Sequence, residues 1–99
     1  MLSETEYLLI CLTEECAEVQ QLCAKAQRFG LDSYHPDDSL KRQNIDKLKL
    51  EINDILGVIS KLEALGLWDG KVTDDELITR KINKLDKMMN FSKSIGTLQ

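Results

Sequence analysis

The chain has little of several features that mark common protein classes. Aromatic residues make up only 5% of it, proline occurs once, and its three cysteines form no Cys-x-x-Cys pair. An odd cysteine count without that spacing argues against a disulfide framework and against a structural zinc site. The net charge is −4, so the basic excess that drives phosphate neutralisation is missing, and we expect no nucleic-acid partner.

Long apolar segments are also missing. No apolar run reaches the roughly 18 residues that a membrane-spanning helix needs, and the segment after Met1 lacks the basic start of a signal peptide. We therefore expect a cytoplasmic protein with no membrane partner, in which Cys11, Cys16 and Cys23 are reduced thiols. Its 99 residues are enough for one domain, residues 1–99, with a core of aliphatic side chains.

Two breaks in the hydrophobic pattern divide the chain into three predicted helices. The first break, residues 30–39, contains the only proline, and the second is residues 66–73. The helix before the first break is predicted over about residues 3–29. Ser3 and Glu6 form a capping-box pattern at its start, and Gly30 is a natural stop.

The other two helices follow the same logic. The second is predicted from a start within residues 39–44 to Leu65, with Gly66 as its cap. The third begins at Thr73 or Asp74, where Thr73 and Glu76 match a capping box, and continues to about Ser92. No alternating strand pattern is present. The sequence predicts an all-α fold, an antiparallel helical hairpin plus a third helix.

An acid interrupts the apolar stripe of the first predicted helix. At about 100° per residue, Glu15 falls in the middle of the stripe, Glu18 lies to one side and Glu14 further out. A carboxylate on a core face is costly unless it is paired or binds a metal. The stripe consists of Leu8, Leu12, Val19, Leu22, Cys23 and Ala26.

The second predicted helix repeats this pattern. Glu51 lies near the edge of its stripe and Asp54 at the margin, and residues spaced i and i+3 face the same way. Packing the two helices along their stripes would bring four carboxylates together, which suits Mg²⁺ or Mn²⁺. The alternative is that these acids are solvated surface residues. The stripe consists of Ile45, Leu48, Ile52, Ile55, Ile59 and Leu62.

The chain lacks the residues that several other kinds of site require. Di-iron bundles need Glu-x-x-His on two helices, and the only histidine, His35, lies in the first break. No calcium-binding loop and no Gly-rich phosphate loop are present. His35 is interpreted as a solvated loop residue, and Trp68, in the second break, as a core or interface residue.

Two segments resemble a known family. Residues 14–18, Glu-Glu-Cys-Ala-Glu, match the Glu-Glu-x-x-Glu motif of MazG-like, all-α nucleoside triphosphate pyrophosphohydrolases. Residues 51–54, Glu-Ile-Asn-Asp, match the family's Glu-x-x-Asp motif, and residues 81–84 resemble the basic stretch of its following helix. The likeness extends to about residue 91. The spacing between the motifs is longer than usual in the family, with the extra length around residues 31–43.

This resemblance implies a site and a reaction. Lys81 and Lys84 occupy positions where the family places cations near the substrate phosphates, and Glu14 is a further candidate ligand. The expected reaction cleaves a nucleoside triphosphate between its α- and β-phosphates to the monophosphate and pyrophosphate. The residues expected to bind Mg²⁺, with Mn²⁺ as a substitute, and to carry catalysis are Glu15, Glu18, Glu51 and Asp54.

Two alternatives to this reading stay open at the level of sequence. One is a relative that acts on a dUTP, dCTP or phosphoribosyl-ATP type of substrate. The other is a helical interaction module whose acids pair with lysines of a partner. In either case three helices with apolar stripes do not close a four-helix bundle, so we expect a homodimer or homotetramer that completes a bundle-like core.

Overall fold

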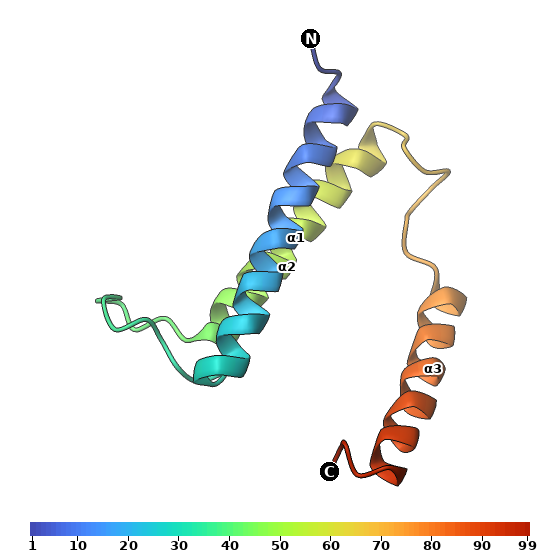
Figure 1. Ribbon diagram of the computed structural model, residues 1–99. Coiled ribbons are helices and arrows are strands. Elements are labelled where there is room, and N and C mark those ends of the chain that lie inside the picture. Colours follow the sequence, from blue (N-terminus) through green and yellow to red (C-terminus); the bar gives the residue numbers. More distant parts are fainter.

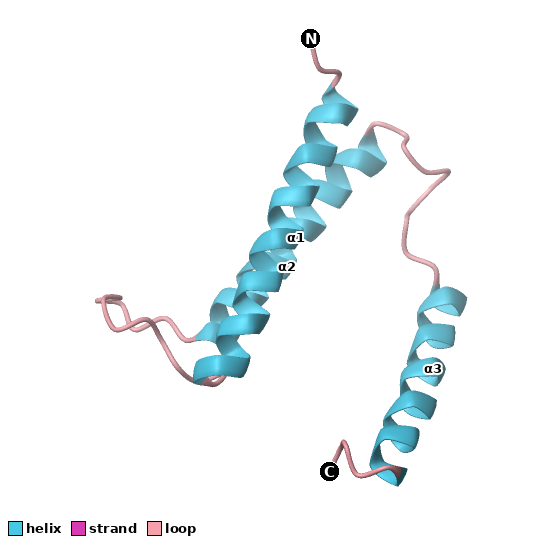
Figure 2. Ribbon diagram, viewed as in Figure 1, coloured by secondary structure: helices cyan, strands magenta, loops and turns pink.

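Three α-helices make up the regular structure of the protein. The computed structural model describes residues 1–99, with α1 at Glu4–Phe29, α2 at Asn44–Ala64 and α3 at Asp75–Ser94 (Figure 1). All the remaining residues are loops or turns, and no strand is present (Figure 2). The predicted all-α class is confirmed. None of the three helices has both the length and the apolar character needed to cross a membrane.

The ends of α1 are set by the residues that the sequence indicated. The Ser3 Oγ accepts a hydrogen bond from the Glu6 N–H at 3.1 Å, and Glu6 Oε2 accepts one from the Ser3 N–H at 3.4 Å. This reciprocal pair satisfies two amides that the first turn leaves without partners. At the other end Gly30, with φ of 100°, donates its N–H to the Ala26 carbonyl and stops the helix.

The bounds of α2 and α3 differ from the prediction in detail. Helix α2 ends at Ala64, one residue early, and α3 continues to Ser94. The predicted Thr73 cap of α3 is wrong. Asp74 caps the helix instead, because its Oδ1 accepts from the N–H groups of Glu76 and Leu77 at 3.0 and 3.1 Å. A carboxylate there also interacts favourably with the positive end of the helix dipole.

Helices α1 and α2 form an antiparallel hairpin, and no other pair of helices is in contact (Figure 1). The buried apolar residues at their contact are Leu22 and Leu62. Three residues assigned to the apolar stripes, Cys23, Ile45 and Ile52, are exposed instead. They lie about 60° or more from the centre of the contact face, and a single neighbouring helix covers only a narrow strip. By the same count Glu51 lies near the centre of the face of α2, not at its edge.

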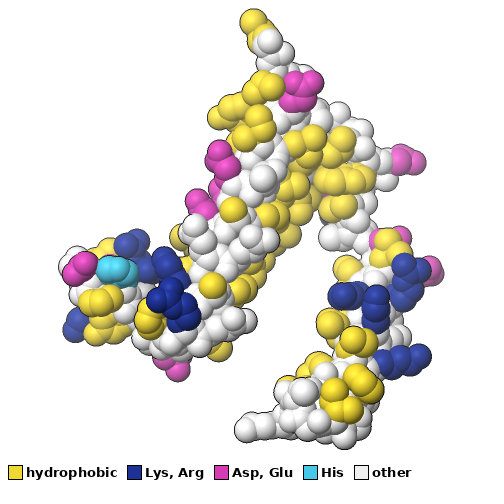
Figure 3. All heavy atoms as spheres, in the orientation of Figure 1, with side chains coloured by type: hydrophobic (Ala, Val, Ile, Leu, Met, Phe, Trp, Pro, Cys, Tyr) yellow, Lys and Arg dark blue, Asp and Glu magenta, His cyan; other side chains and the backbone are white.

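Helix α3 lies apart from the hairpin in Figure 1. Its apolar residues Ile78, Ile82, Leu85 and Met89, spaced on one face, are all about half exposed, and Figure 3 shows hydrophobic side chains on the surfaces of both the hairpin and α3. The radius of gyration is 17.4 Å, against about 13 Å for a compact chain of this length. Only 3 of 99 residues are buried, so most of the apolar surface has no cover within one chain.

Candidate functional site

Three carboxylates meet where α1 and α2 pack together. Glu15 and Glu18 lie one turn apart on α1, and Glu51 lies on the facing side of α2. Each offers one carboxylate oxygen, and these three oxygens all lie within 4.8 Å of one another. We call Glu15, Glu18 and Glu51 the acid cluster. Residues on two helices therefore combine into one group of neighbouring carboxylates.

The acid cluster lacks partners from the protein. Glu15 Oε2 and Glu51 Oε2 are buried and accept no hydrogen bond, and neither these two residues nor Glu18 forms an ion pair with a basic side chain. A buried polar atom without a partner destabilises a fold, and a buried carboxylate does so more strongly. The arrangement is therefore suited to a cation that supplies the missing positive charge.

The crowding of carboxylates changes the acidity of Glu51. The carboxylate of Glu15, and then that of Glu18, would accept a hydrogen bond only from a protonated Glu51; this, together with burial and the neighbouring negative charges, raises the pKa of Glu51 to about 7. Two ionised carboxylates are both acceptors, so a hydrogen bond between them requires a proton on one of them. Near neutral pH the metal-free cluster consequently retains part of a proton.

This shift predicts how the stability of the metal-free protein depends on pH. The pKa of Glu51 is about 7 in the folded chain against an ordinary value of 4.5, so the folded state binds the proton more tightly. Its stability should fall as pH rises from about 4.5 to 7 and level off above that. Melting in EDTA from pH 5 to 8.5 tests this. Glu51→Gln should lack this part of the pH dependence; an identical pH profile would contradict the shift.

The other predicted site residues lie outside the acid cluster. Asp54 is one turn after Glu51 but is exposed, and Glu14 is exposed on α1. Lys81 and Lys84 lie on α3, which contacts neither α1 nor α2 within the chain. Of the predicted set, the structure brings three acids together and leaves Asp54 and the two lysines elsewhere.

Three basic residues beside the acid cluster were not anticipated. Lys25, Arg42 and Lys47 line a groove of about 310 Å³ together with Glu18 and Glu51. The sequence carried a signal for two of them: Lys25 follows Glu18 by seven residues, and Lys47 precedes Glu51 by four. Both spacings place the residue pairs on one helix face. The position of Arg42 depends on the loop and has no such signal.

Asp38 organises the loop between α1 and α2. Its side chain is only 7% exposed and contacts Arg42 Nε at 3.1 Å and Lys47 Nζ at 3.7 Å. It also accepts hydrogen bonds from the N–H groups of Leu40 and Arg42. The hydrogen bond from the Arg42 side chain, together with these two, lowers the pKa of Asp38 to about 2. Asp38 therefore stays ionised at neutral pH and holds two cations at the groove.

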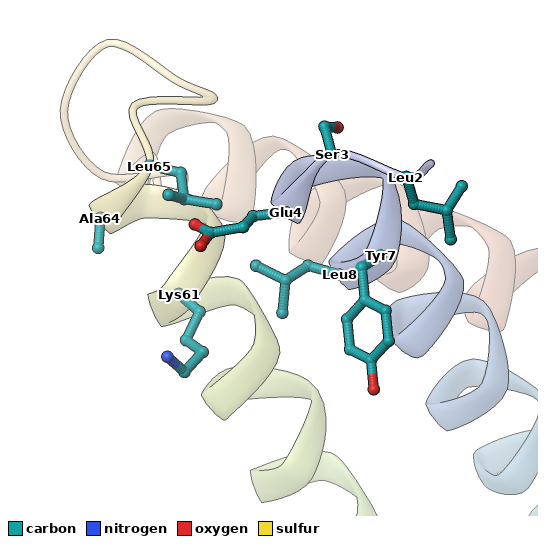
Figure 4. A pocket seen from close by; sticks show the side chains of 8 residues that line it. All are labelled: Leu2, Ser3, Glu4, Tyr7, Leu8, Lys61, Ala64 and Leu65. Atoms are coloured by element: carbon teal, nitrogen blue, oxygen red, sulfur yellow. The ribbon is translucent and has the colours of Figure 1, made fainter.

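A second hollow lies at the other end of the hairpin. It has a volume of about 530 Å³, and Leu2, Tyr7, Leu8, Ala64 and Leu65 supply most of its lining (Figure 4). Its charged residues are one acid, Glu4, and one base, Lys61. It shares no residue with the acid cluster. This end of the hairpin is an apolar surface rather than a site with converging polar groups.

The candidate site is thus built from side chains of α1, α2 and the loop that joins them. Each of its charged residues has a defined position: the acids at the helix contact, and the cations toward the loop. In comparisons with known proteins, no family model, curated protein or solved structure matches the chain.

Proposed function

We propose that the protein is a divalent-cation-dependent nucleotide pyrophosphohydrolase whose acid cluster binds the cation. The observation that carries this proposal is the convergence of Glu15, Glu18 and Glu51, with two buried oxygens that lack partners. Mg²⁺ prefers such oxygen ligands and balances their charge, and Mn²⁺ is a chemically similar substitute. Asp54, one turn after Glu51, is close enough in sequence to join through a water molecule.

The bond to be cleaved is inferred from the sequence motifs. Their resemblance to MazG-like enzymes indicates hydrolysis of a nucleoside triphosphate to the monophosphate and pyrophosphate. A bound Mg²⁺ neutralises phosphate charge and lowers the pKa of a coordinated water. The carboxylates of the acid cluster would hold that ion, and Glu15 or Glu18 would orient the attacking water or accept its proton. A dUTP, dCTP or phosphoribosyl-ATP type of substrate is compatible with the same residues.

The proposed active form is a homodimer or homotetramer in which α3 packs on a hairpin of a neighbouring copy. The exposed apolar face of α3, the exposed sides of the hairpin and the large radius of gyration support this. A hairpin and one further helix supply three helices, and self-association supplies the rest of a bundle-like core. Lys81 lies about 70° from the centre of the apolar face of α3 and Lys84 about 130°, so this packing would place Lys81 at the margin of the contact and Lys84 outside it.

Melting the protein in EDTA and then with Mg²⁺ or Mn²⁺ tests the cation site. A cation at 100 times its dissociation constant stabilises the folded state by about 2.7 kcal/mol, which raises Tm by about 10 °C or more for a chain of this length. Pyrophosphate release from a panel of nucleoside triphosphates should require the same cation. A Tm insensitive to cations, with no pyrophosphate released, would instead support the helical interaction module.

A further inference from the structure

The groove beside the acid cluster has the same order of charges along both helices. On α1, Glu18 is followed by Lys25 and then by Phe29, at spacings of seven and four residues. On α2, Glu51 is preceded by Lys47 and then by Asn44. Because the helices are antiparallel, both series run from the acid cluster toward the loop. The distance from Glu18 to Lys25 is about 10 Å along the helix.

The cations of this groove are held in place without being neutralised. Asp38 contacts both Arg42 and Lys47, so one carboxylate positions two positive charges. Lys25 forms no ion pair, and it lines the groove with Arg42 and Lys47. A planar guanidinium and two ammonium groups are the side chains that proteins use for phosphate oxygens. At the loop end of the groove these three positive charges face the single carboxylate of Asp38, whereas Glu18 and Glu51 line its other end, so the loop end attracts an anion.

Beyond the cations the groove adjoins a pocket of about 560 Å³. The two hollows share Lys25 and Lys47, and the pocket is further lined by Phe29, Tyr34 and His35. This volume lies within the range of small-ligand sites, and aromatic rings there offer flat surfaces on which a planar base can stack. The loop that carries Tyr34 and His35 is tied at its base, where the Asn44 N–H bonds the Ser33 carbonyl at 2.8 Å and the Asn44 side chain bonds the Gly30 carbonyl at 3.0 Å.

We propose that this groove is the nucleotide-binding surface of the site, with the polyphosphate on Lys25, Arg42 and Lys47 and the base in the pocket at Phe29 and Tyr34. This assignment rests on the proposed function, because it takes the acid cluster as the position of the cation that meets the phosphates. The phosphate-binding residues are then Lys25, Arg42 and Lys47 on the hairpin and its loop, instead of Lys81 and Lys84 on α3. The assignment also accounts for the loop of residues 30–43, which shapes the pocket.

A nucleotide fits the order of the groove better than an extended acidic chain does. Its negative charge is confined to the phosphates and its flat ring lies at one end, which matches the succession of acid cluster, cations and aromatic residues. A nucleic-acid strand would instead need a continuing basic surface. The negative charge of the acid cluster ends the basic stretch on one side, and the pocket ends it on the other.

Binding measurements on the full chain test the phosphate site and the base pocket separately. The probes are inorganic triphosphate in EDTA, and α,β-methylene deoxynucleoside triphosphates in EDTA and with Mg²⁺. Lys25→Met should weaken both probes by about tenfold or more, because a charge-assisted contact is lost. Tyr34→Leu should weaken the nucleotides by several-fold and leave inorganic triphosphate unchanged. Lys87→Met, on α3, is the matched control and should bind like the unaltered chain.

Each result either supports or overturns the assignment. Lys25 has no ion-pair partner and is exposed, so helical circular dichroism should be retained, and Lys25→Gln provides a second variant. Lys25→Met binding both probes like Lys87→Met would overturn the phosphate site. Tyr34→Leu binding nucleotides normally would overturn the base pocket. If the chain releases no pyrophosphate but Lys25→Met still loses triphosphate binding in EDTA, the proposed reaction fails while the anion groove stands.

Discussion

Glu51→Gln is expected to abolish pyrophosphate release. Glu51 provides the only α2 carboxylate of the acid cluster, so the amide removes a ligand and a negative charge from the proposed cation site. Charge stabilisation by a bound cation contributes several kcal/mol to such reactions, and the expected loss of turnover is therefore on the order of a thousandfold. Steady-state pyrophosphate release with saturating Mg²⁺ measures it. Turnover within a few-fold of the unaltered chain would refute the assignment.

The same variant should have the opposite effect on stability without metal. In EDTA above pH 7, Glu51→Gln removes a charge that its neighbours oppose, so it should melt at a higher temperature than the unaltered chain. Added Mg²⁺ should raise the Tm of the unaltered chain and leave that of the variant nearly constant. Asp46→Asn is the matched control, since it alters an exposed acid on the same helix and should retain both turnover and the response to Mg²⁺.

If the proposed self-association through α3 is right, Leu85→Asp should convert the oligomer to a monomer and unfold α3. Leu85 is 46% exposed within one chain and lies at the centre of the apolar face of α3. Most of the stability of a protein helix comes from the packing of its apolar face, so α3 should lose much of its helical structure when that face is not covered. Light scattering should show a fall to the mass of one chain, and circular dichroism should show the loss of about one helix.

Lys87→Asp is the control for this experiment. Lys87 lies about 180° from the apolar face of α3 and is exposed. The same change to aspartate should therefore leave the mass and the helical signal nearly unchanged. If the unaltered chain is already monomeric at micromolar concentration with α3 fully helical, self-association through this face is wrong.

Much of the fold follows from local chemistry that the sequence displays. Ser3 with Glu6, and Gly30, set the ends of α1 because caps satisfy amides and carbonyls within a few residues. For α3 the sequence leaves Thr73 and Asp74 as possible caps, since both residues suit that role, and only the backbone conformation selects Asp74 over the Thr73–Glu76 capping box. Ile45 and Ile52 were placed in the core because periodicity gives a stripe but not its width, which depends on the number of helices that pack against it.

In the candidate site, too, the sequence indicates the residues on helices better than those in the loop. Glu15 was recognisable because it interrupts an apolar stripe, and Glu51 because a matching motif and spacing marked the second helix. Asp54 was grouped with them by its i+3 spacing, yet a residue at that angle faces solvent in the hairpin. Arg42 was missed because Asp38 positions it through contacts within an irregular loop. Periodicity describes residues on helices, whereas loop residues acquire their positions from tertiary hydrogen bonds.

The hydrogen bonds that join the two ends of the loop between α1 and α2 have an evolutionary consequence. Asn44 bonds to Ser33 and Gly30, and the Ile45 N–H bonds to the Leu31 carbonyl at 3.0 Å. These bonds fix where the two helices leave the loop, so changes at its tip need not shift the carboxylates at the helix contact. Asp38 apart, sequence drift around Tyr34–Leu40 would then alter the lining of the proposed base pocket while the acid cluster keeps its place. If the proposed function holds, such a separation would let the hairpin change its binding specificity in small steps, each of which preserves the acid cluster.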